Sequence, residues 1–479
     1  MKIFSRSETS DVKINTAFFR IAGLLLIFGA ALAIRLFPIL VTPEPVKAGF
    51  GPFGDSALYH RIAYNLCKGH GFSGVDNGSA FGLPRPGQPV VYEPAIARGP
   101  VYPAFLASIY RFLGDASAME SIKRWHVNWN RVRIVQSIID ALICLLLFWA
   151  VRVLYPDRYL PAFLAAALYG VSFYNIFYTR ALLSESVTTF LVAVAIIAGV
   201  MALKSGRAVY WFIVGAGFGL ASLCRPEYIL FPFFLAGFIF LRQRHDIRGA
   251  VKATAVLVFG LVLVISPWAI RNYMIYKQFI PTSVGALGLN LFNGTFENVK
   301  SQERALYTDR ISKSPEMEKE ITAWRRKLKY HFNRGTIGFK EYDLRFKALA
   351  LDTIKEYPLN SSAVWIQRLP RLWYQNYIPL YFYREPSGTW FIIYFLFSIL
   401  ALILMKPKIR VACTPIFLLF LYMNLVYLPF HIEPRYGVTI YPGLSVLTAI
   451  GLWMSGAKVW EWVHFLQSKT EQNKLAHPA

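Results

Sequence analysis

Long apolar segments with few charged residues constrain this chain more than any other feature of its sequence. Because lipid offers no hydrogen-bonding partners, apolar segments of about 18 residues or more cross a bilayer only as helices. Charged residues make up 16% of the 479 residues, whereas soluble domains contain roughly 25%. We therefore predict an all-α integral membrane protein with about ten transmembrane helices. The predicted spans are Phe18–Leu40, Val132–Leu154, Leu160–Tyr178, Ala181–Leu203, Val209–Leu223, Tyr228–Leu241, Val251–Ile270, Thr389–Met405, Val411–Phe430 and Val438–Met454.

The positions of the basic residues predict how the chain is oriented. Lys and Arg precede the first span and then occur in every second short connection. Because basic residues retain short loops in the cytoplasm, we expect these connections and both termini there. The two long loops, 41–131 and 271–388, then lie outside. The net charge of +24 follows from this topology, and no motif typical of nucleic-acid binding is present.

The two long loops are predicted to contain helices. In the first, the apolar spacing predicts one helix from Asp55 to Gly69 and a second from Pro100 to Gly114, both suited to the membrane surface. The second long loop shows further charged and amphipathic helical patterns. The predicted organisation is a transmembrane module over 1–270 that includes the first outer loop, a periplasmic helical loop over 271–388, and C-terminal transmembrane helices with a cytoplasmic tail over 389–479.

Polar residues gather at the outer ends of the predicted helices, and ionisable groups at the membrane edge are costly and usually functional. Asp55 is a candidate general base facing a cavity at the membrane surface; the alternative is an N-cap of the helix that follows it. Glu93 is a candidate second acid or metal ligand. Arg98 lies just before a predicted helix and could bind phosphate. For Glu93 and Arg98 the alternative is an ordinary ion pair within the loop.

Glu185 lies just inside an apolar run at the outer junction of two predicted spans. It is either a functional acid or the partner of Arg180. A second charged pair, Arg225 with Glu227, is interpreted as a structural pair at an outer turn.

Arg271 and Arg435 follow or precede predicted spans at the outer surface, and His431 lies in the same outer segment as Arg435. Guanidinium groups match phosphate geometry with two hydrogen bonds, so both arginines suit a lipid-phosphate site. The alternative is anchoring at the interface, which the neighbouring Trp268 and Tyr436 favour. The four cysteines show no spacing typical of a metal site or a disulfide framework.

Four short motifs, taken in order, resemble the membrane-embedded glycosyltransferases with the C-type fold that use polyprenyl-phosphate-linked sugars. The most similar group is the bacterial relatives of protein O-mannosyltransferases, which include lipid A aminoarabinose and galacturonic acid transferases. The motifs are Arg35 followed by Gly54-Asp55-Ser56-Ala57-Leu58-Tyr59; Arg98-Gly99-Pro100-Val101-Tyr102-Pro103; Pro267-Trp268-Ala269-Ile270-Arg271-Asn272-Tyr273 with Asn290 and Asn293; and Pro434-Arg435-Tyr436 before Tyr441-Pro442.

The resemblance implies that Asp55 is the catalytic base or a metal-linked acid. Many family members have two adjacent acids here, whereas this chain has Asp55-Ser56. A second acid would then come from Glu93 or Glu185.

The resemblance also implies a reaction and a location. A sugar would pass, with inversion, from a polyprenyl phosphate to a hydroxyl group of a lipid, glycan or protein. Arg98, Arg271, Arg435 and His431 are the candidates for the donor phosphate site. A divalent metal ion is left open as a cofactor. The expected location is the bacterial inner membrane, with the active site on the periplasmic face.

Two other classes of function stay open. A multispan transporter or flippase of a lipid-linked glycan predicts broken helices at mid-membrane and repeated halves. A lipid-linked glycan ligase or polymerase shares the lipid substrate but differs in its donor chemistry.

Overall fold

The computed structural model describes most of the chain. The described residues are 8–41, 55–75, 92–113, 130–284, 287–296, 315–333, 337, 339–373 and 387–476.

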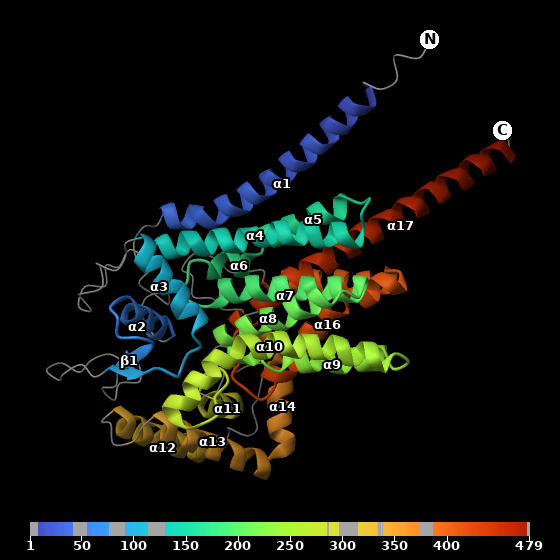
Figure 1. Ribbon diagram of the computed structural model, residues 1–479. Helices are drawn as coiled ribbons and strands as arrows, with labels where there is room; N and C mark the ends of the chain where they lie inside the picture. The colour runs from blue at the N-terminus through green and yellow to red at the C-terminus, as the bar shows by residue number, and fades with distance from the viewer. Residues whose placement is uncertain are drawn as a thin grey trace.

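Helices that run side by side form an elongated bundle (Figure 1). Six segments of the described residues are long and apolar enough to cross a membrane: Arg20–Val41, Asn130–Leu154, Glu185–Ser205, Ile247–Tyr276, Pro407–Tyr427 and Pro434–Ser468. The chain is therefore a multi-pass membrane protein. The bundle helices are α1 (Glu8–Val41), α4 (Asn130–Leu154), α5 (Leu160–Gly170), α6 (Phe173–Tyr178), α7 (Glu185–Ser205), α8 (Ala208–Cys224), α9 (Phe231–Arg242), α10 (Ile247–Tyr276), α15 (Ser387–Leu404), α16 (Pro407–Tyr427) and α17 (Tyr441–Ala476).

The other four predicted spans correspond to shorter helices, so the count of ten stays a prediction. The predicted span Leu160–Tyr178 was wrong as a single helix: α5 ends at Gly170, and α6 begins at Phe173. The predicted turn between the fifth and sixth spans is confirmed, because α8 ends at Cys224 and α9 begins at Phe231.

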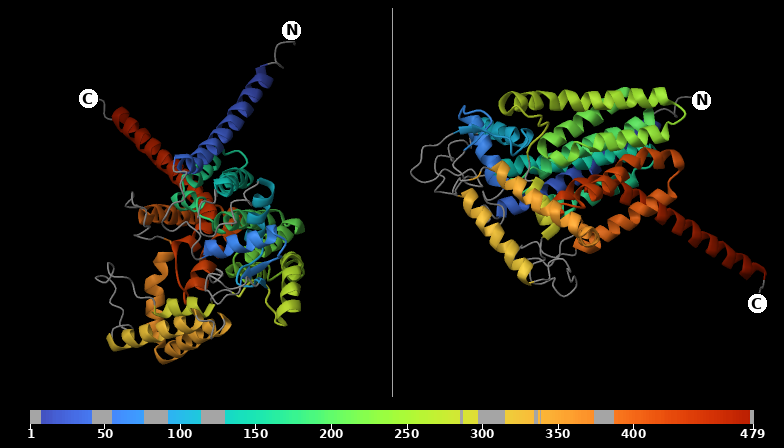
Figure 2. Two further views of the ribbon diagram at one scale, coloured as in Figure 1. Left: turned by 90° about the vertical axis from the view of Figure 1, so that its left-hand side faces the viewer. Right: turned by 90° about the horizontal axis from the view of Figure 1, so that it is seen from below.

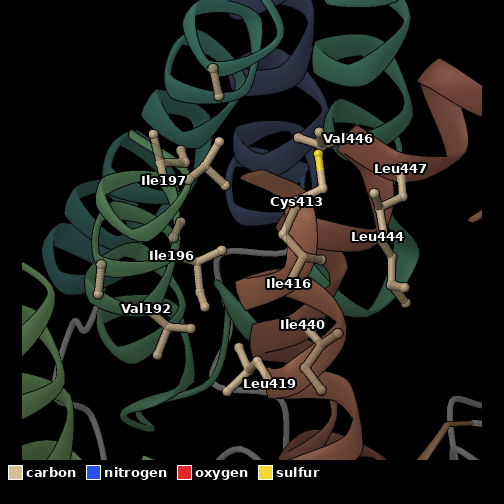
Figure 3. Packing of buried hydrophobic residues seen from close by; sticks show 14 of the residues in the cluster. Val192, Ile196, Ile197, Cys413, Ile416, Leu419, Ile440, Leu444, Val446 and Leu447 are labelled. Carbon is tan, nitrogen blue, oxygen red and sulfur yellow. The ribbon is translucent and has the colours of Figure 1, made fainter. Parts of the chain in front are cut away.

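The core of the bundle is apolar and closely packed. Side chains of α7, α16 and α17 interdigitate, among them Ile196, Ile416 and Leu447 (Figure 3). The glycine-rich stretch of α8 packs closely against α10, because a Cβ on Gly215 would overlap the carbonyl of Leu257 on α10.

An ion pair is enclosed within this apolar core. Arg35 of α1 and Asp140 of α4 are 0% and 1% exposed, and the Arg35 Nε lies 2.6 Å from the Asp140 Oδ2. Arg35 Nη1 also donates to the carbonyls of Ala31 and Gly170, each at 2.9 Å. The hydroxyl of Tyr169 donates to Asp140 Oδ1 at 2.7 Å. Three helices, α1, α4 and α5, are thus joined by one charged network.

Shorter elements cover one end of the bundle (Figures 1 and 2). The two predicted helices of the first outer loop are confirmed as α2 (Asp55–Cys67) and α3 (Val101–Leu113). An antiparallel pair of strands that the all-α prediction lacked, β1 (Ser73–Val75) and β2 (Tyr92–Pro94), lies between them in sequence. The second outer loop forms α11 (Leu287–Phe296), α12 (Pro315–Asn333), α13 (Phe339–Glu356) and α14 (Pro358–Arg368).

The chemistry-bearing residues and the basic connections lie at opposite ends of the bundle helices. Helix α7 begins with Glu185 and ends near Lys204, and α8 begins after Arg207 and ends before Arg225. Helices α7 and α8 run antiparallel against each other, so Glu185 and Arg225 are at one end and the basic turn is at the other. This arrangement agrees with the predicted topology, in which basic turns stay in the cytoplasm.

Candidate active site

Asp55 lies between two arginines that come from distant parts of the chain. It is the first residue of α2, where the helix dipole favours a negative charge. Its Oδ1 accepts a hydrogen bond from Arg98 Nη2, and its Oδ2 accepts one from Arg435 Nη1 at 3.1 Å. These contacts occupy both carboxylate oxygens, so the described contacts of Asp55 go beyond those of an N-cap. The Asp55 side chain remains 32% exposed, which places it at the rim of the charged cluster.

A close backbone approach positions Arg98. The next residue, Gly99, lies so near the end of α8 that a Cβ there would overlap the carbonyl of Leu223. Only glycine allows this approach without a shift of the backbone. The contact brings the segment before α3 against the same end of α8 that carries Arg225.

Glu185 lies behind Asp55 in a buried position. Its side chain is 2% exposed, and Oε1 accepts a hydrogen bond from Arg225 Nη1 at 2.9 Å. Arg435 Nη1 lies 3.9 Å from the same oxygen, so Arg435 links Glu185 to Asp55. The Oε2 of Glu185 is buried, and none of the described residues forms a hydrogen bond with it. The alternative that Glu185 pairs with Arg180 is wrong, since Arg225 takes that place.

Arg225 is held in place by a second carboxylate. Its Nε lies 2.6 Å from Glu227 Oε1, which also accepts a hydrogen bond from the Tyr427 hydroxyl at 2.7 Å. The Tyr427 ring stacks on Tyr436 with centroids 4.8 Å apart, and Arg225 lies 4.9 Å from the Tyr436 centroid. The interpretation of Arg225 with Glu227 as a structural pair was therefore incomplete, because Arg225 also contacts Glu185.

His431 takes part through Glu433. Its Nε2 lies 2.9 Å from Glu433 Oε1, and Glu433 Oε2 lies 2.5 Å from Arg435 Nε. The cluster contains one more carboxylate than arginine: Asp55, Glu185, Glu227 and Glu433 face Arg98, Arg225 and Arg435.

The arginines control the protonation of Asp55. Burial alone would raise the pKa of this carboxyl, but the nearby guanidinium groups, that of Arg98 above all, outweigh burial and lower its pKa to about 2. Asp55 is therefore ionised at neutral pH.

Two predicted site residues lie outside this ion-pair network. Arg271 Nη1 donates to the carbonyl of Ala95 at 2.9 Å, and Arg271 Nη2 donates to that of Phe72 at 3.1 Å. The guanidinium also lies 4.6 Å from the Trp268 ring centroid. Arg271 thus braces the chain on both sides of the β1–β2 pair. Glu93 lies on β2 with an exposed side chain.

Whether the site can bind a divalent metal ion depends on which acidic side chains lie close together. In the part of the chain that the structure describes, no three His, Cys, Asp or Glu side chains converge as ligands for a metal ion. The carboxylates of the cluster are engaged by arginines instead.

The comparisons with known proteins agree with the resemblance drawn from the sequence. The family model described as dolichyl-phosphate-mannose-protein mannosyltransferase matches residues 123–270. This match includes helices α4 to α9 and most of α10, and therefore Glu185 and Arg225. No curated protein matches the chain in sequence.

Solved structures confirm the predicted C-type architecture at the level of the fold. The oligosaccharyltransferase AglB from Archaeoglobus fulgidus, in complex with an inhibitory peptide and a dolichol-phosphate, has a TM-score of 0.56 and 13% identity over 97% of this chain. The Archaeoglobus fulgidus oligosaccharyltransferase in the apo form has a TM-score of 0.54 and 12% identity over 95% of this chain. The present chain covers 52% of each of those chains, about half their length. A third structure is ArnT from Cupriavidus metallidurans bound to undecaprenyl phosphate. Its alignment has 12% identity and covers 92% of this chain and 78% of the ArnT chain, and its TM-score is only 0.35.

Proposed function

We propose that this chain is an inverting glycosyltransferase that moves a sugar from a polyprenyl-phosphate donor to a hydroxyl group of a lipid, glycan or protein. The family match and the shared fold support this class of activity. The observation that carries the proposal is the position of Asp55, partly open to solvent and held between two guanidinium groups, with the buried Glu185 beside it.

The electrostatics of the free site raise a difficulty that the donor itself resolves. A carboxylate with both oxygens bound by arginines is a poor base, since its pKa of about 2 reflects stabilisation of its charged form. Phosphate oxygens accept the same charge-assisted hydrogen bonds from guanidinium groups. In our proposal the donor phosphate takes Arg98 and Arg435 from Asp55, and the freed carboxylate turns toward the acceptor.

The reaction then balances with groups that the cluster contains. Asp55 takes the proton of the acceptor hydroxyl while the oxygen of that hydroxyl forms a bond to the anomeric carbon. The bond from that carbon to the phosphate oxygen breaks, and its electron pair leaves with the phosphate. Negative charge therefore grows on the phosphate, where Arg98 and Arg435 stabilise it.

Glu185 and Arg225 provide the fixed part of the site. Because Arg225 is held by Glu185 and Glu227 together, it keeps its position while the other two arginines exchange partners. The unpartnered Oε2 of Glu185 can accept a hydrogen bond from a hydroxyl of the sugar or acceptor. We assign Arg271 to bracing the first outer loop instead of binding phosphate directly.

The proposed location is the periplasmic face of a bacterial inner membrane. The cluster lies at the end of α7 and α8 opposite their basic turn. Since basic turns stay in the cytoplasm, the cluster belongs to the outer face.

Replacement of Asp55 by Asn tests the role of the base. Surface glycolipids and glycoproteins of cells with and without the chain are compared by mass spectrometry to identify the product. In the Asp55→Asn variant we expect transfer to fall by at least about 100-fold. The matched control is Asp352→Asn, at an exposed position of α13, which should transfer normally. Undiminished transfer by the Asp55→Asn variant excludes the base role.

Binding of undecaprenyl phosphate to the purified protein tests the exchange separately. If Asp55 competes with phosphate for the arginines, the Asp55→Asn variant should bind this lipid about tenfold more tightly, equivalent to 1.4 kcal/mol. Undecaprenol, which lacks the phosphate, should bind both proteins equally. Weaker binding of undecaprenyl phosphate by the variant contradicts the proposed exchange of arginine partners. Transport of the lipid across the membrane of vesicles without formation of a glycosidic product favours a flippase.

A further inference from the structure

Helix α17 continues far beyond the bundle at the end opposite the charged cluster (Figures 1 and 2). It has 36 residues, which corresponds to about 54 Å, whereas the hydrocarbon core of a bilayer is about 30 Å thick. Its packed part contains buried residues up to Gly451, and the residues from Gly456 to Ser468 are all exposed. The exposed stretch, residues 456–468, makes up 13 of the 36 residues, about a third of the helix.

The extension is amphipathic along its length. Val459, Trp462, Val463 and Leu466 follow the spacing of one helical face and are 59%, 62%, 40% and 41% exposed. The opposite face carries Glu461, His464 and Ser468. An apolar stripe of this kind, in contact with water along its whole length, is unfavourable and marks an interaction surface.

The position of the stripe identifies the medium that covers it. The stripe lies at the end of the apolar segment Pro434–Ser468 and begins only a few residues after the last buried residue, Gly451, so the nearest apolar surface is the membrane that α17 crosses. Trp460 and Trp462 are residues of the type enriched at membrane–water interfaces. We propose that residues 457–468 form an interfacial helix that lies on the lipid headgroup region of the membrane face opposite the charged cluster.

A local feature of the backbone allows the necessary change of direction. The Ser455 hydroxyl donates to the carbonyls of Gly451 and Leu452, at 2.8 and 3.1 Å. Gly456 follows it, with open space where a side chain would be. Helices often bend where a serine hydroxyl donates to a backbone carbonyl of the preceding turn and where glycine and serine are adjacent. The bend between the span and the interfacial helix is placed at Ser455 and Gly456.

Single-cysteine variants labelled with a nitroxide test the proposal in the full chain. The background is Cys67→Ser, because the other three cysteines are buried. Labels are placed on the apolar face (Trp462→Cys, Val463→Cys) and on the polar face (Glu461→Cys, His464→Cys). Reference labels are Val262→Cys, which lies exposed on the spanning helix α10, and Asp352→Cys on an exposed outer helix. The protein is placed in vesicles of phosphatidylethanolamine and phosphatidylglycerol.

Collision rates with oxygen and with a water-soluble nickel complex give the depth of each label. We expect labels at 462 and 463 to resemble the Val262 reference and labels at 461 and 464 to resemble the Asp352 reference. If all four labels meet the nickel complex equally, the helix projects into water and the proposal is wrong. If the labels at 462 and 463 are shielded from both reagents and show spin coupling between copies, the stripe is a protein–protein interface, which also overturns it.

Discussion

Two arginine–aspartate pairs in this molecule have the same chemistry and opposite surroundings. Arg35 and Asp140 are fully enclosed among α1, α4 and α5, and carbonyl and hydroxyl groups of the protein bond to both, although Arg35 Nη2 has no hydrogen-bond partner among the described residues. Asp55 with Arg98 is about one quarter to one third exposed, at the rim of a cluster that contains an unpartnered carboxylate oxygen. The first pair is 0% and 1% exposed, whereas solvent reaches the second, which in our proposal exchanges its partners for those of a ligand.

The comparison shows that an ion pair near a membrane says little about function until its surroundings are known. Removal of one partner of a buried pair is strongly destabilising, because it leaves an uncompensated buried charge. A pair at a rim contributes little to folding, since solvent screens it. The enclosed pair should therefore control folding, and the open pair should control chemistry.

The largest effect is expected from removal of Asp140. The Asp140→Ala variant leaves the Arg35 guanidinium buried without its counter-charge, which should cost about 3–5 kcal/mol. The measurement is thermal unfolding of the purified protein in detergent. The Asp55→Ala variant should unfold within a few degrees of the wild type. Equal losses of stability in the two variants would remove the distinction between the pairs.

Replacement of Arg98 should affect turnover more than stability. The Arg98→Gln variant lacks one donor to the leaving phosphate, which should lower transfer by about 100-fold to 1,000-fold. Arg345→Gln, at an exposed intrahelical pair on α13, is the control and should transfer normally. If the Arg98→Gln variant instead fails to fold while it transfers at the normal rate per folded molecule, the open pair is structural.

Glu227 offers a smaller test of the fixed part of the cluster. The Glu227→Gln variant removes the charge that holds Arg225. Arg225 should then shift toward Glu185 and displace the Glu185 Oε2 from its position. We expect a loss of transfer of about tenfold, or about 1.4 kcal/mol, which is near the lower end of the roughly 1.5–3 kcal/mol that a hydrogen bond to a charged group contributes. The Tyr427→Phe variant removes only the neutral hydrogen bond to Glu227 and should lose less. An equal loss in both variants contradicts a charge-based role of Glu227.

The smallest effect concerns acid stability. The pKa of Asp55 is lowered to about 2, below the ordinary value of about 3.9. The stability it contributes is therefore present above about pH 4 and is lost as the pH falls toward 2. In the Arg98→Gln variant this pKa should rise, so less stability is lost over that interval. Unfolding in detergent at a series of pH values checks the slopes, and identical slopes would show that Arg98 does not control Asp55.

Much of the fold followed from the sequence because bilayer physics permits few solutions. Long apolar segments predicted the bundle helices. The helical spacing of apolar residues, together with a glycine after each pattern, predicted α2 and α3. The interruption between α5 and α6 was missed, because the apolar run from Leu160 to Tyr178 continues across it. Gly170 and Ser172, residue types typical of a helix end and a helix start, mark the interruption, but the apolar run outweighed them in the prediction.

The site was predicted in part. Asp55, Arg98 and Arg435 were candidates, and the structure brings them together from three distant segments. Arg225 was assigned to a local pair because its nearest acid is two residues away, and sequence spacing cannot report the packing of α8 beside Glu185. Asp140 was overlooked, although an acid inside a predicted span was a signal that could have identified it.

The hydrogen bond that the Gly170 carbonyl accepts at the end of α5 bears on how the protein is assembled. A helix that stops within the membrane leaves backbone oxygens that lipid cannot satisfy. Arg35 of α1 supplies a donor to Gly170, and Tyr394 of α15 supplies one to Leu168 at 2.8 Å. The end of α5 is therefore completed by helices made much earlier and much later during synthesis. A nascent chain that has not yet produced α15 should hold α5 in an unfinished state, which quality-control proteases of the membrane could recognise.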